Sequence, residues 1–491
     1  MEHHDLIVIG SGPAGRRAAV QAAKLGRNVL VVEGRRRVGG VSVHTGTIPS
    51  KTLRETALNL SGWRERGFYG SSYRVKEVIC GEDLGMRLGK TLEHEVDVLE
   101  HQFQRNNVRT LAGMARFTGP NTVAVAQGDG SEVPVSADKF LIAVGTEPFH
   151  PPGIPFDDEH VLDSDAIIST PRVPRSLVVI GAGVIGIEYA TIFSALDVPV
   201  TLIEPRETFL DFVDREIIGE FVHTLRDRGM AIRLGASVDR IERGADGWPV
   251  TWLADGRRVR SDMVLYAAGR KGATATLGLD ACGLATDHRG RLEVDPATFQ
   301  TAVPHIYAAG DVIGFPSLAS TSMEQGRIAA CHAFGLPTPP APAYFPYGIY
   351  AVPEISTVGL NEEDCRARGI GYEIGIARFR ETSRGHIMGL SSGMMKLIFS
   401  LKTRRLLGAH IIGEGATELV HIGQAVLNLK GTLDYFIENT FNYPTLAEAY
   451  KVAALDAWNR MGNTGSIPEN QLVKPSKCPE PPDNLTSATA C

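Results

Sequence analysis

The amino-acid sequence repeats one short pattern, at its start and again near residue 180. Residues 6–15 read LIVIGSGPAG and residues 177–186 read LVVIGAGVIG. In each copy an apolar run typical of a buried strand leads into glycines spaced as GxGxxG and then into a helix-forming segment. A second apolar run ends in Glu33 in the first copy and in Glu204 in the second, equally far from the first glycine of each. The repeat predicts two βαβ units built around parallel strands.

The three glycines of each copy have separate tasks in a dinucleotide site. The first permits the tight turn, the second lets a pyrophosphate approach the backbone, and the third lets the helix pack on the strand. The helix N-terminus then faces the phosphates, and the glutamate after the second strand accepts hydrogen bonds from ribose hydroxyls. The residues expected to do this are Gly10, Gly12, Gly15 and Glu33 in the first unit, and Gly181, Gly183, Gly186 and Glu204 in the second.

Two arginines bear on the choice between NAD and NADP in the second unit. A glutamate at the ribose suits the diol of NAD and repels the 2′-phosphate of NADP. Arg206, two residues beyond Glu204, and Arg270 carry positive charges that offset this repulsion. We therefore expect the second unit to accept both nucleotides, and the sequence leaves the preference open.

Bulk properties favour a multidomain protein that binds small molecules. At 491 residues the chain has the length of about three domains. Its formal net charge of −6 gives no reason to expect nucleic acid or an anionic membrane as a partner. No run approaches the ~20 apolar residues of a membrane span, and the first residues lack the features of a secretory signal. We expect a cytoplasmic protein.

The cysteines give no sign of a metal site or a local redox pair. All six lie far apart, without the close spacing that ligates zinc. We expect reduced thiols without a catalytic role, and no metal. The six are Cys80, Cys282, Cys331, Cys365, Cys478 and Cys491.

Proline-rich segments mark the expected boundaries between domains. Residues 148–155 precede the second unit, and residues 337–346 lead into a last region of strands and helices, with a further crossing expected near 270–280. Within the first part, residues 52–106 are expected to be largely helical and residues 122–144 to form short strands. The segment after residue 465 is rich in Pro, Ser, Thr and Asn, and is expected to be a mobile tail.

The chain resembles the flavoprotein disulfide reductases over almost its whole length, up to about Met461. The resemblance rests on the two glycine units and on residues 301–311, TAVPHIYAAGD, which are similar to the glycine-aspartate motif of that family. It implies FAD in the first unit, NAD(P) in the second, and a homodimer formed by the last domain. It also implies that Asp311 holds the ribityl chain of FAD; the alternative for this residue is a helix N-cap.

The fold implied by this resemblance is α/β, with two Rossmann-like dinucleotide-binding domains and a C-terminal α+β dimerisation domain. The expected FAD-binding domain comprises residues 1–150 and a returning central part at 276–341. The NAD(P)-binding domain is expected at 151–275, the dimerisation domain at 342–464 and the tail at 465–491. Further implied contacts to FAD come from Gly39, Gly40, Ser42, Lys51, Ala115, Gly145 and Ala319, and to NAD(P) from Gly269.

Two features of the reductases are absent from this sequence. Where that family has two cysteines five residues apart, this chain has Ser42 and Thr47. A hydroxyl cannot cycle between thiolate and disulfide, so disulfide reduction by this route is excluded. Tyr443 stands where the family has a histidine, and an unperturbed tyrosine is a poor base at neutral pH. The two losses are consistent with each other.

This altered pattern resembles the soluble pyridine nucleotide transhydrogenases. The resemblance is carried by GTIPSK at 46–51, FNYPT at 441–445 and AEAY at 447–450, although members often keep a cysteine at the position of Ser42. It implies that Lys51 and Glu188 pair beside the flavin, where a cation stabilises negative charge. It also implies that Tyr443 and Glu448 approach the flavin of the partner subunit, or else pack in the interface.

The expected activity is hydride transfer between NADPH and NAD. Both nucleotides would use the second unit in turn, with FAD as the intermediate carrier, and this scheme predicts ping-pong kinetics. Two alternatives stay open. The first is a diaphorase that passes electrons to a quinone, and the second is a flavin-bound redox sensor without catalysis. Retention of both glycine loops, Lys51, Glu188 and Asp311 favours an enzyme.

Overall fold

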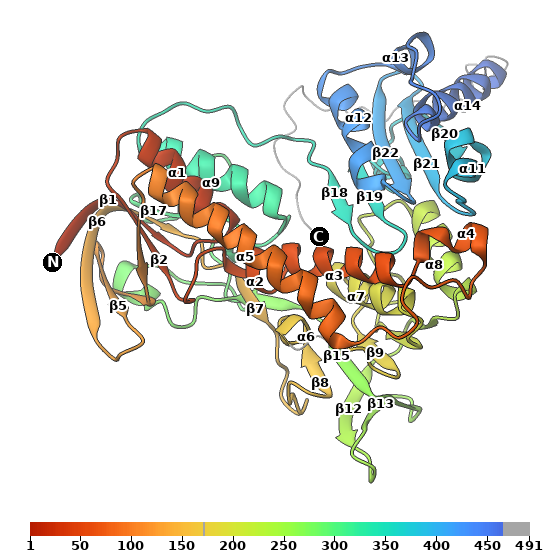
Figure 1. The fold of residues 1–491 in the computed structure, drawn as a ribbon. Helices are drawn as coiled ribbons and strands as arrows, with labels where there is room; N and C mark the ends of the chain where they lie inside the picture. The colour runs from red at the N-terminus through yellow and green to blue at the C-terminus, as the bar shows by residue number, and fades with distance from the viewer. Residues whose placement is uncertain (170–171, 465–491) are drawn as a thin grey trace.

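Three sheets of five or more strands organise the part of the chain that the structure describes (Figure 1). The structure is a computed structural model, and it describes residues 1–169 and 172–464. Helices cover these sheets, so the expected α/β class is confirmed. The tail expected at 465–491, with Cys478 and Cys491, lies outside the described residues.

The first glycine unit belongs to a seven-stranded mixed sheet. Its strand order is β3-β2-β1-β6-β5-β4, and β17 also pairs with β6. β1 pairs in parallel with both β2 and β6, while β4 and β5 form an antiparallel ribbon. The strands are β1 (Glu2–Ile9), β2 (Val29–Glu33), β3 (Arg109–Ala112), β4 (Met114–Gly119), β5 (Thr122–Ala126), β6 (Glu132–Ile142) and β17 (Ile306–Ala308).

β6 is longer than the short strands expected between residues 122 and 144. It pairs with β5 over residues 132–136, with β1 over residues 135–142 and with β17 over residues 140–142. β17 is more than 160 residues away from β6 in the sequence. No local sequence pattern could therefore predict this pairing. The strand continues because partners on both sides satisfy its backbone groups.

Helices from three separate segments cover one side of this sheet. Figure 1 shows α1, α9 and α5 stretched along it, and their apolar residues share one core with β1 and β2. α1 begins directly at Pro13, whose missing N–H costs nothing in the first turn. These helices are α1 (Pro13–Lys24), α5 (Gly81–Arg105) and α9 (Ala319–Ala333).

The segment between β2 and α5 is mostly helical, as expected, but its main helix begins earlier. α3 starts at Thr47 and therefore includes the Ile-Pro-Ser-Lys segment. Residues 70–80 between α4 and α5 are not helical. The helices are α2 (Gly40–His44), α3 (Thr47–Leu60), the short η1 (Trp63–Glu65) and α4 (Arg66–Tyr69).

The second glycine unit belongs to a parallel five-stranded sheet with the order β11-β10-β9-β15-β8. β9 and β10 flank α7, so this segment forms the predicted second βαβ unit. A small antiparallel sheet, β12-β13-β14, projects from it (Figure 1). The elements are β8 (Val161–Asp163), α6 (Ala166–Ser169), β9 (Leu177–Ile180), α7 (Val184–Ala195), β10 (Val200–Ile203), α8 (Arg215–Asp227), β11 (Ala231–Arg233), β12 (Val238–Arg243), β13 (Pro249–Leu253), β14 (Arg258–Arg260) and β15 (Met263–Tyr266).

The last region is an antiparallel sheet, β18-β19-β22-β21-β20, whose apolar residues pack against α12 and α14. Figure 1 places it apart from the first sheet, with α3 and α7 below it. Its elements are β18 (Tyr347–Ile349), β19 (Ile355–Gly359), α10 (Glu362–Ala367), β20 (Tyr372–Arg378), η4 (Phe379–Glu381), α11 (Ser383–Ile387), β21 (Met394–Ser400), β22 (Leu406–Ile412), α12 (Ala416–Asn428), α13 (Leu433–Glu438) and α14 (Glu448–Thr464).

A buried lysine fastens the second unit to this last region. The Lys396 ammonium on β21 is fully buried and lies 2.9 Å from the carboxylates of Asp214 and Glu216 at the start of α8. It also contacts Glu362 on α10. The three carboxylates surround the ammonium, which balances part of their charge.

A two-stranded ladder connects the first and second units. β7 (Thr146–Pro148) pairs antiparallel with β16 (Arg270–Gly272). Two short 3₁₀ helices, η2 (Leu279–Cys282) and η3 (Asp311–Ile313), flank β17 where the chain returns to the first sheet. No helix among the described residues is long and apolar enough to span a membrane.

Candidate active site

The first glycine of each loop has a backbone conformation that excludes a side chain. Gly10 and Gly181 both have a φ of +100°. A Cβ atom would lie 2.4 Å from the Ala143 carbonyl oxygen at Gly10, and 2.7 Å from the Ala267 carbonyl oxygen at Gly181. The two loops therefore turn in the same way beside corresponding strands.

The other two glycines differ in what surrounds them. A Cβ at Gly15 would lie 1.9 Å from the Gly10 carbonyl oxygen, and a Cβ at Gly186 would lie 1.9 Å from that of Gly181. Gly12 and Gly183 have no atom within 4 Å of such a Cβ. Each loop thus packs tightly on its helix and leaves open space at its second glycine, where the helix N-terminus favours a phosphate.

Glu33, at the end of β2, is held by backbone and side-chain donors of its own loop. The N–H groups of Ser11 and Arg35 donate to its two carboxylate oxygens at 3.0 and 2.9 Å. The Ser11 hydroxyl also donates to Glu33. That hydroxyl accepts the Gly39 N–H at 2.8 Å, so Gly39 is linked to Glu33 through Ser11.

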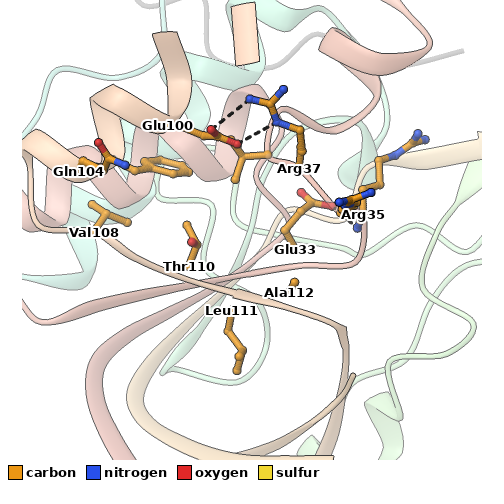
Figure 2. Close-up of a pocket in the computed structure, with 12 residues that line it drawn as sticks. Glu33, Arg35, Arg37, Glu100, Gln104, Val108, Thr110, Leu111 and Ala112 are labelled. Atoms are coloured by element: carbon orange, nitrogen blue, oxygen red, sulfur yellow. Dashed lines mark hydrogen bonds and ion pairs between the residues drawn. The ribbon is translucent and has the colours of Figure 1, made fainter. Parts of the chain in front are cut away.

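A cavity of about 210 Å³ opens beside Glu33 (Figure 2). Arg37 closes one side of it and donates to Glu100 of α5 at 3.1 Å. Apolar side chains and a carboxylate next to one another suit a flat base attached to a ribose. The lining residues are Glu33, Arg35, Arg36, Arg37, Val38, Glu100, Phe103, Gln104, Val108, Thr110, Leu111 and Ala112.

A second cavity, of about 290 Å³, extends from Glu33 and Arg35 along the glycine loop. Because Glu33 and Arg35 line both cavities, the two are adjacent. Among the residues expected to contact FAD, this lining includes Gly10, Gly12, Glu33, Gly40, Ser42, Gly145, Asp311 and Ala319. Gly15 packs beneath the loop, and Ala115 is buried in the core of the sheet, so neither lines the cavity.

Asp311 presents a carboxylate without a partner to this cavity. It makes no hydrogen bond through its side chain with another described residue, and burial raises its pKa although the charge of Arg270 opposes the shift. The N-cap position of η3 belongs to Gly310. The acceptor is thus available to hydroxyl groups of a bound molecule, and the N-cap alternative is not supported.

Lys51 and Glu188 pair where α3 of the first unit meets α7 of the second. The Lys51 ammonium lies 2.7 and 2.8 Å from the two Glu188 oxygens. Glu188 is nearly buried and also accepts the Tyr350 N–H at 2.9 Å. The Lys51 ammonium lies 4.9 Å from the centre of the Tyr350 ring. Three regions of the chain therefore fix the position of this cation.

The positions of the expected cysteine pair hold hydroxyl groups in the cavity wall. Ser42 and Thr47 both line the second cavity, and the Ser42 hydroxyl donates to the Gly39 carbonyl oxygen at 3.0 Å. The four cysteines in the described ranges are free thiols, and none of them lines either cavity. The described residues around the cavity offer no thiol for redox chemistry.

Glu204, the counterpart of Glu33 in the second unit, has a charged partner. One oxygen accepts the Ala182 N–H at 2.7 Å, and the other accepts from the Arg206 side chain at 2.7 Å. Burial raises the pKa of Glu204, but the hydrogen bonds from Arg206 and Ala182 outweigh it and hold the pKa below its ordinary value. The Arg206 side chain remains 53% exposed and lies 3.6 Å from Asp211, so it is accessible to a ligand.

Arg270 is placed at the junction of the units. It donates to Thr146, Ser164 and Asp165 at 2.8 to 3.0 Å, across the β7–β16 ladder. Each of its three nitrogens donates in these contacts. From the sequence we expected Arg270 to offset, with Arg206, the repulsion between Glu204 and a 2′-phosphate. Gly269, the preceding residue, has a φ of +132°, and its carbonyl oxygen accepts the Phe149 N–H at 3.1 Å.

Comparison with known families agrees with this arrangement. A family model described as pyridine nucleotide-disulphide oxidoreductase matches residues 4–326, and the dimerisation-domain model of the same family matches residues 345–454. The chain belongs to the pyridine nucleotide-disulphide oxidoreductase family.

Relatives of this oxidoreductase include proteins named soluble pyridine nucleotide transhydrogenase. One from Mycobacterium bovis is 50% identical over 94% of this chain and 98% of its own length. One from Klebsiella pneumoniae is 42% identical over 93% of this chain and 98% of its own length. The resemblance to that group stated from the sequence is confirmed.

Two solved structures have the same fold as this chain. LpdA from Mycobacterium tuberculosis matches with a TM-score of 0.84 at 24% identity, covering 93% of this chain and 99% of that one. The HOCl-induced flavoprotein disulfide reductase RclA from Escherichia coli, in its Cu(II) complex, matches with a TM-score of 0.83 at 26% identity, over 93% of this chain and 99% of that one.

Tyr443 and Glu448 lie on the last region of this oxidoreductase, apart from the Lys51–Glu188 pair. Tyr443 is 64% exposed and its hydroxyl lies 2.5 Å from that of Ser383. Glu448 begins α14, and one of its oxygens is buried without a hydrogen-bond partner among the described residues. No described contact within one chain joins them to Lys51 or Glu188.

Sequence reasoning missed several residues that shape the site. Ser11 bridges Glu33 and Gly39, Asp165 receives Arg270 and lines the second cavity, and Tyr350 contacts both members of the ion pair. Ser11 stands inside the glycine motif, and its hydroxyl was a signal that could have been used. Asp165 and Tyr350 carry no local signal, because long-range packing alone brings them to the site.

Proposed function

We propose that this oxidoreductase transfers hydride between NADPH and NAD, with FAD as its bound cofactor. One observation carries the proposal. The two dinucleotide units meet at the Lys51–Glu188 pair, and the neighbouring cavity is lined by Ser42 and Thr47 at the positions where the reductases have their two cysteines. The printed names of the relatives support the same activity. When bound, FAD supplies a ring system that accepts a hydride and returns it.

The residues of the first unit fit FAD along both cavities. Glu33 would accept from the ribose hydroxyls, and the open space at Gly12 would admit the pyrophosphate at the N-terminus of α1. Asp311, an acceptor without a described partner, would bind hydroxyls of the ribityl chain. Gly40, Ser42, Gly145 and Ala319 line the same space and would complete the enclosure.

The Lys51–Glu188 pair supplies fixed charge at the meeting point of the two ligands. Glu188 holds the Lys51 ammonium in one position and so reduces the reorganisation needed when negative charge develops nearby. Lys51→Met is expected to slow flavin reduction by NADPH by about 100-fold, the loss typical of one preorganised electrostatic contact. Stopped-flow absorbance measures this rate. Lys90→Met on the exposed face of α5 is the matched control.

The second unit binds the two nucleotides in turn. Glu204 suits the diol of NAD, and the accessible Arg206 suits the 2′-phosphate of NADP. We further propose that the protein is a homodimer in which Tyr443 and Glu448 approach the partner's site, as the match to the dimerisation model supports. The word soluble in the relatives' names supports a cytoplasmic location.

The deciding experiment separates reduction of the flavin from its reoxidation. The FAD-loaded protein is reduced anaerobically with one equivalent of NADPH, and thio-NAD is then added. Stoichiometric appearance of reduced thio-NAD as the flavin absorbance returns supports transhydrogenation. In steady state the same mechanism gives parallel lines in double-reciprocal plots.

The alternatives give different results in the same experiment. A diaphorase is bleached by NADPH but stays reduced in the presence of thio-NAD until a quinone is added. A non-catalytic sensor is not bleached by NADPH. Either result contradicts the proposed function.

A further inference from the structure

An aromatic pair lies between the second unit and the last region. Phe212 belongs to the loop between β10 and α8, and Tyr347 is the first residue of β18. Their ring centres are 4.5 Å apart and their planes are tilted by 52°. Phe212 is 38% exposed, whereas Tyr347 packs against the core that the second unit shares with β19 and β21. The pair therefore has one buried side and one open side.

β18 leads from Tyr347 to a residue that contacts the ion pair of the site. Three residues further on, the Tyr350 N–H donates to Glu188. Burial raises the pKa of Tyr347 to about 12, with a further contribution from the negative charges of Glu188 and Asp311. The phenol is thus within electrostatic reach of one carboxylate from each dinucleotide unit. At physiological pH it is protonated and can donate a hydrogen bond.

The Tyr347 hydroxyl makes no hydrogen bond with another residue in the ranges that the structure describes, and it is not sealed off inside the protein. A tyrosine that is largely covered usually finds a partner for its hydroxyl. Of the two carboxylates whose charges act on the Tyr347 phenol, Asp311 lines the second cavity, and Glu188 holds Lys51 at the junction of the two dinucleotide units. The missing partner is therefore expected on the ligand side.

We propose that Tyr347, supported by the ring of Phe212, is a positioning residue for the nicotinamide, and that its hydroxyl donates to the carboxamide oxygen of NAD and NADP alike. The carboxamide is the polar group at the reacting end of both nucleotides, so one contact serves both. The inference rests on the proposed function, because it takes the second unit as the site of nicotinamide nucleotides. It adds a residue from the last region to that site.

The test compares two ligands that differ only at the nicotinamide end. Binding of NAD and of ADP-ribose to the oxidised, FAD-loaded protein is measured by calorimetry for the parent chain and for Tyr347→Phe. The variant keeps the ring and removes the hydroxyl. NAD binding is expected to weaken about threefold to tenfold, the effect of one hydrogen bond. ADP-ribose binding is expected to stay unchanged.

Two further variants separate positioning from structural support. Phe212→Leu keeps an apolar contact but loses the tilted ring, and is expected to weaken NAD binding less than Tyr347→Phe does. Tyr73→Phe, in the Tyr69–Tyr73 ring pair of the loop before α5, is the matched control and is expected to change neither ligand.

Equal weakening of NAD and ADP-ribose in Tyr347→Phe would overturn the proposal, since it would indicate a structural role. No change for either ligand would overturn it as well. These measurements need no turnover. A chain that fails to transfer hydride while Tyr347→Phe still separates the two ligands would contradict the proposed function and leave the positioning role intact.

Discussion

The two dinucleotide units have nearly the same backbone at their glycine loops but treat their glutamates differently. Glu33 is held by Ser11 and by the backbone of Arg35, and it lies between two cavities enclosed by α5 and the glycine loop. In the second unit Ala182 stands at the position that corresponds to Ser11, so Glu204 receives no hydroxyl there. Its side-chain partner is the half-exposed Arg206. One unit surrounds its ligand with neighbouring segments, whereas the other presents charges to solvent.

The difference corresponds to the difference between a retained cofactor and an exchanged substrate. A ligand that stays bound gains from enclosure, because many contacts slow its release. A ligand that must leave after each half-reaction needs recognition without burial. The two units also differ in anchoring, since the first is covered by α1, α5 and α9 while the second is fastened to the last region through Lys396.

The largest expected effect comes from filling the third glycine of either loop. Gly15→Val and Gly186→Val each place a side chain 1.9 Å from a carbonyl oxygen, a distance that forces the helix away from its strand. Gly15→Val is expected to lose bound FAD. Gly186→Val is expected to retain FAD and lose reduction by NADPH.

Flavin absorbance per protein after gel filtration measures the first effect, and anaerobic bleaching measures the second. Gly219→Ala, in α8 with no atom near the added Cβ, is the control and is expected to change neither. Loss of FAD in Gly186→Val would show that the second unit is needed for FAD binding by the first. It would contradict the separate roles assigned to the two glycine loops.

A smaller effect is expected from the anchor of the second unit. Lys396→Met leaves the buried Asp214 carboxylate and the partly buried Glu362 carboxylate without their cation, which is expected to cost about 3 kcal/mol. The unfolding transition of the second unit should shift to lower temperature in calorimetry, and FAD release should follow at a higher temperature. Lys24→Met, at the exposed end of α1, is the control. A single unchanged transition would contradict this role.

The same anchor is expected to give the protein an acid limit. Burial raises the pKa values of Asp214 and Glu362, but the hydrogen bonds and charge of Lys396, with the nearby His410 at Asp214, outweigh it and hold both values below their ordinary range. Groups with a lowered pKa stabilise the fold above their unfolded pKa, and this stabilisation is lost as pH falls through the folded value. The melting temperature should therefore fall below about pH 4, and less steeply in Lys396→Met. Parallel curves would argue against the anchor as the cause.

The smallest expected effect is on nucleotide choice. Arg206→Ala removes the accessible cation beside Glu204 and is expected to raise KM for NADPH about tenfold, with little change for NADH. Arg260→Ala, an exposed arginine on β14 of the same unit, is the matched control. Equal changes for both nucleotides would indicate that Arg206 supports the loop and does not recognise the phosphate.

The sequence was most informative where structure is encoded locally. The strands, glycine turns and helices of both units could be predicted, because each signal lies within about 30 residues of its neighbours. The resemblance supplied Lys51, Glu188 and the replacement of cysteines by Ser42 and Thr47. Their roles remain predictions, since the structure gives their contacts and not their chemistry.

The contacts that the sequence could not predict join distant segments. Lys396 reaches three carboxylates from α8 and α10, and Tyr347 meets Phe212 across two regions. The spacing of these residues along the sequence follows no helix or strand period. Only the packed fold brings them together. The length of β6 has the same origin, because β17 joins it from a remote part of the chain.

The short β7–β16 ladder, with Arg270 bonded to Thr146 across it, joins the two dinucleotide units directly. Hydride transfer needs the reacting atoms about 3 to 3.5 Å apart, and the second ligand is replaced in every catalytic cycle. A rigid connection between the two units would hold the nicotinamide site at the same distance from the flavin site for either nucleotide. The protein, and not the nucleotide, would then determine the distance between the reacting atoms. NAD and NADP, which differ at the adenosine end, could therefore exchange without a change in that distance.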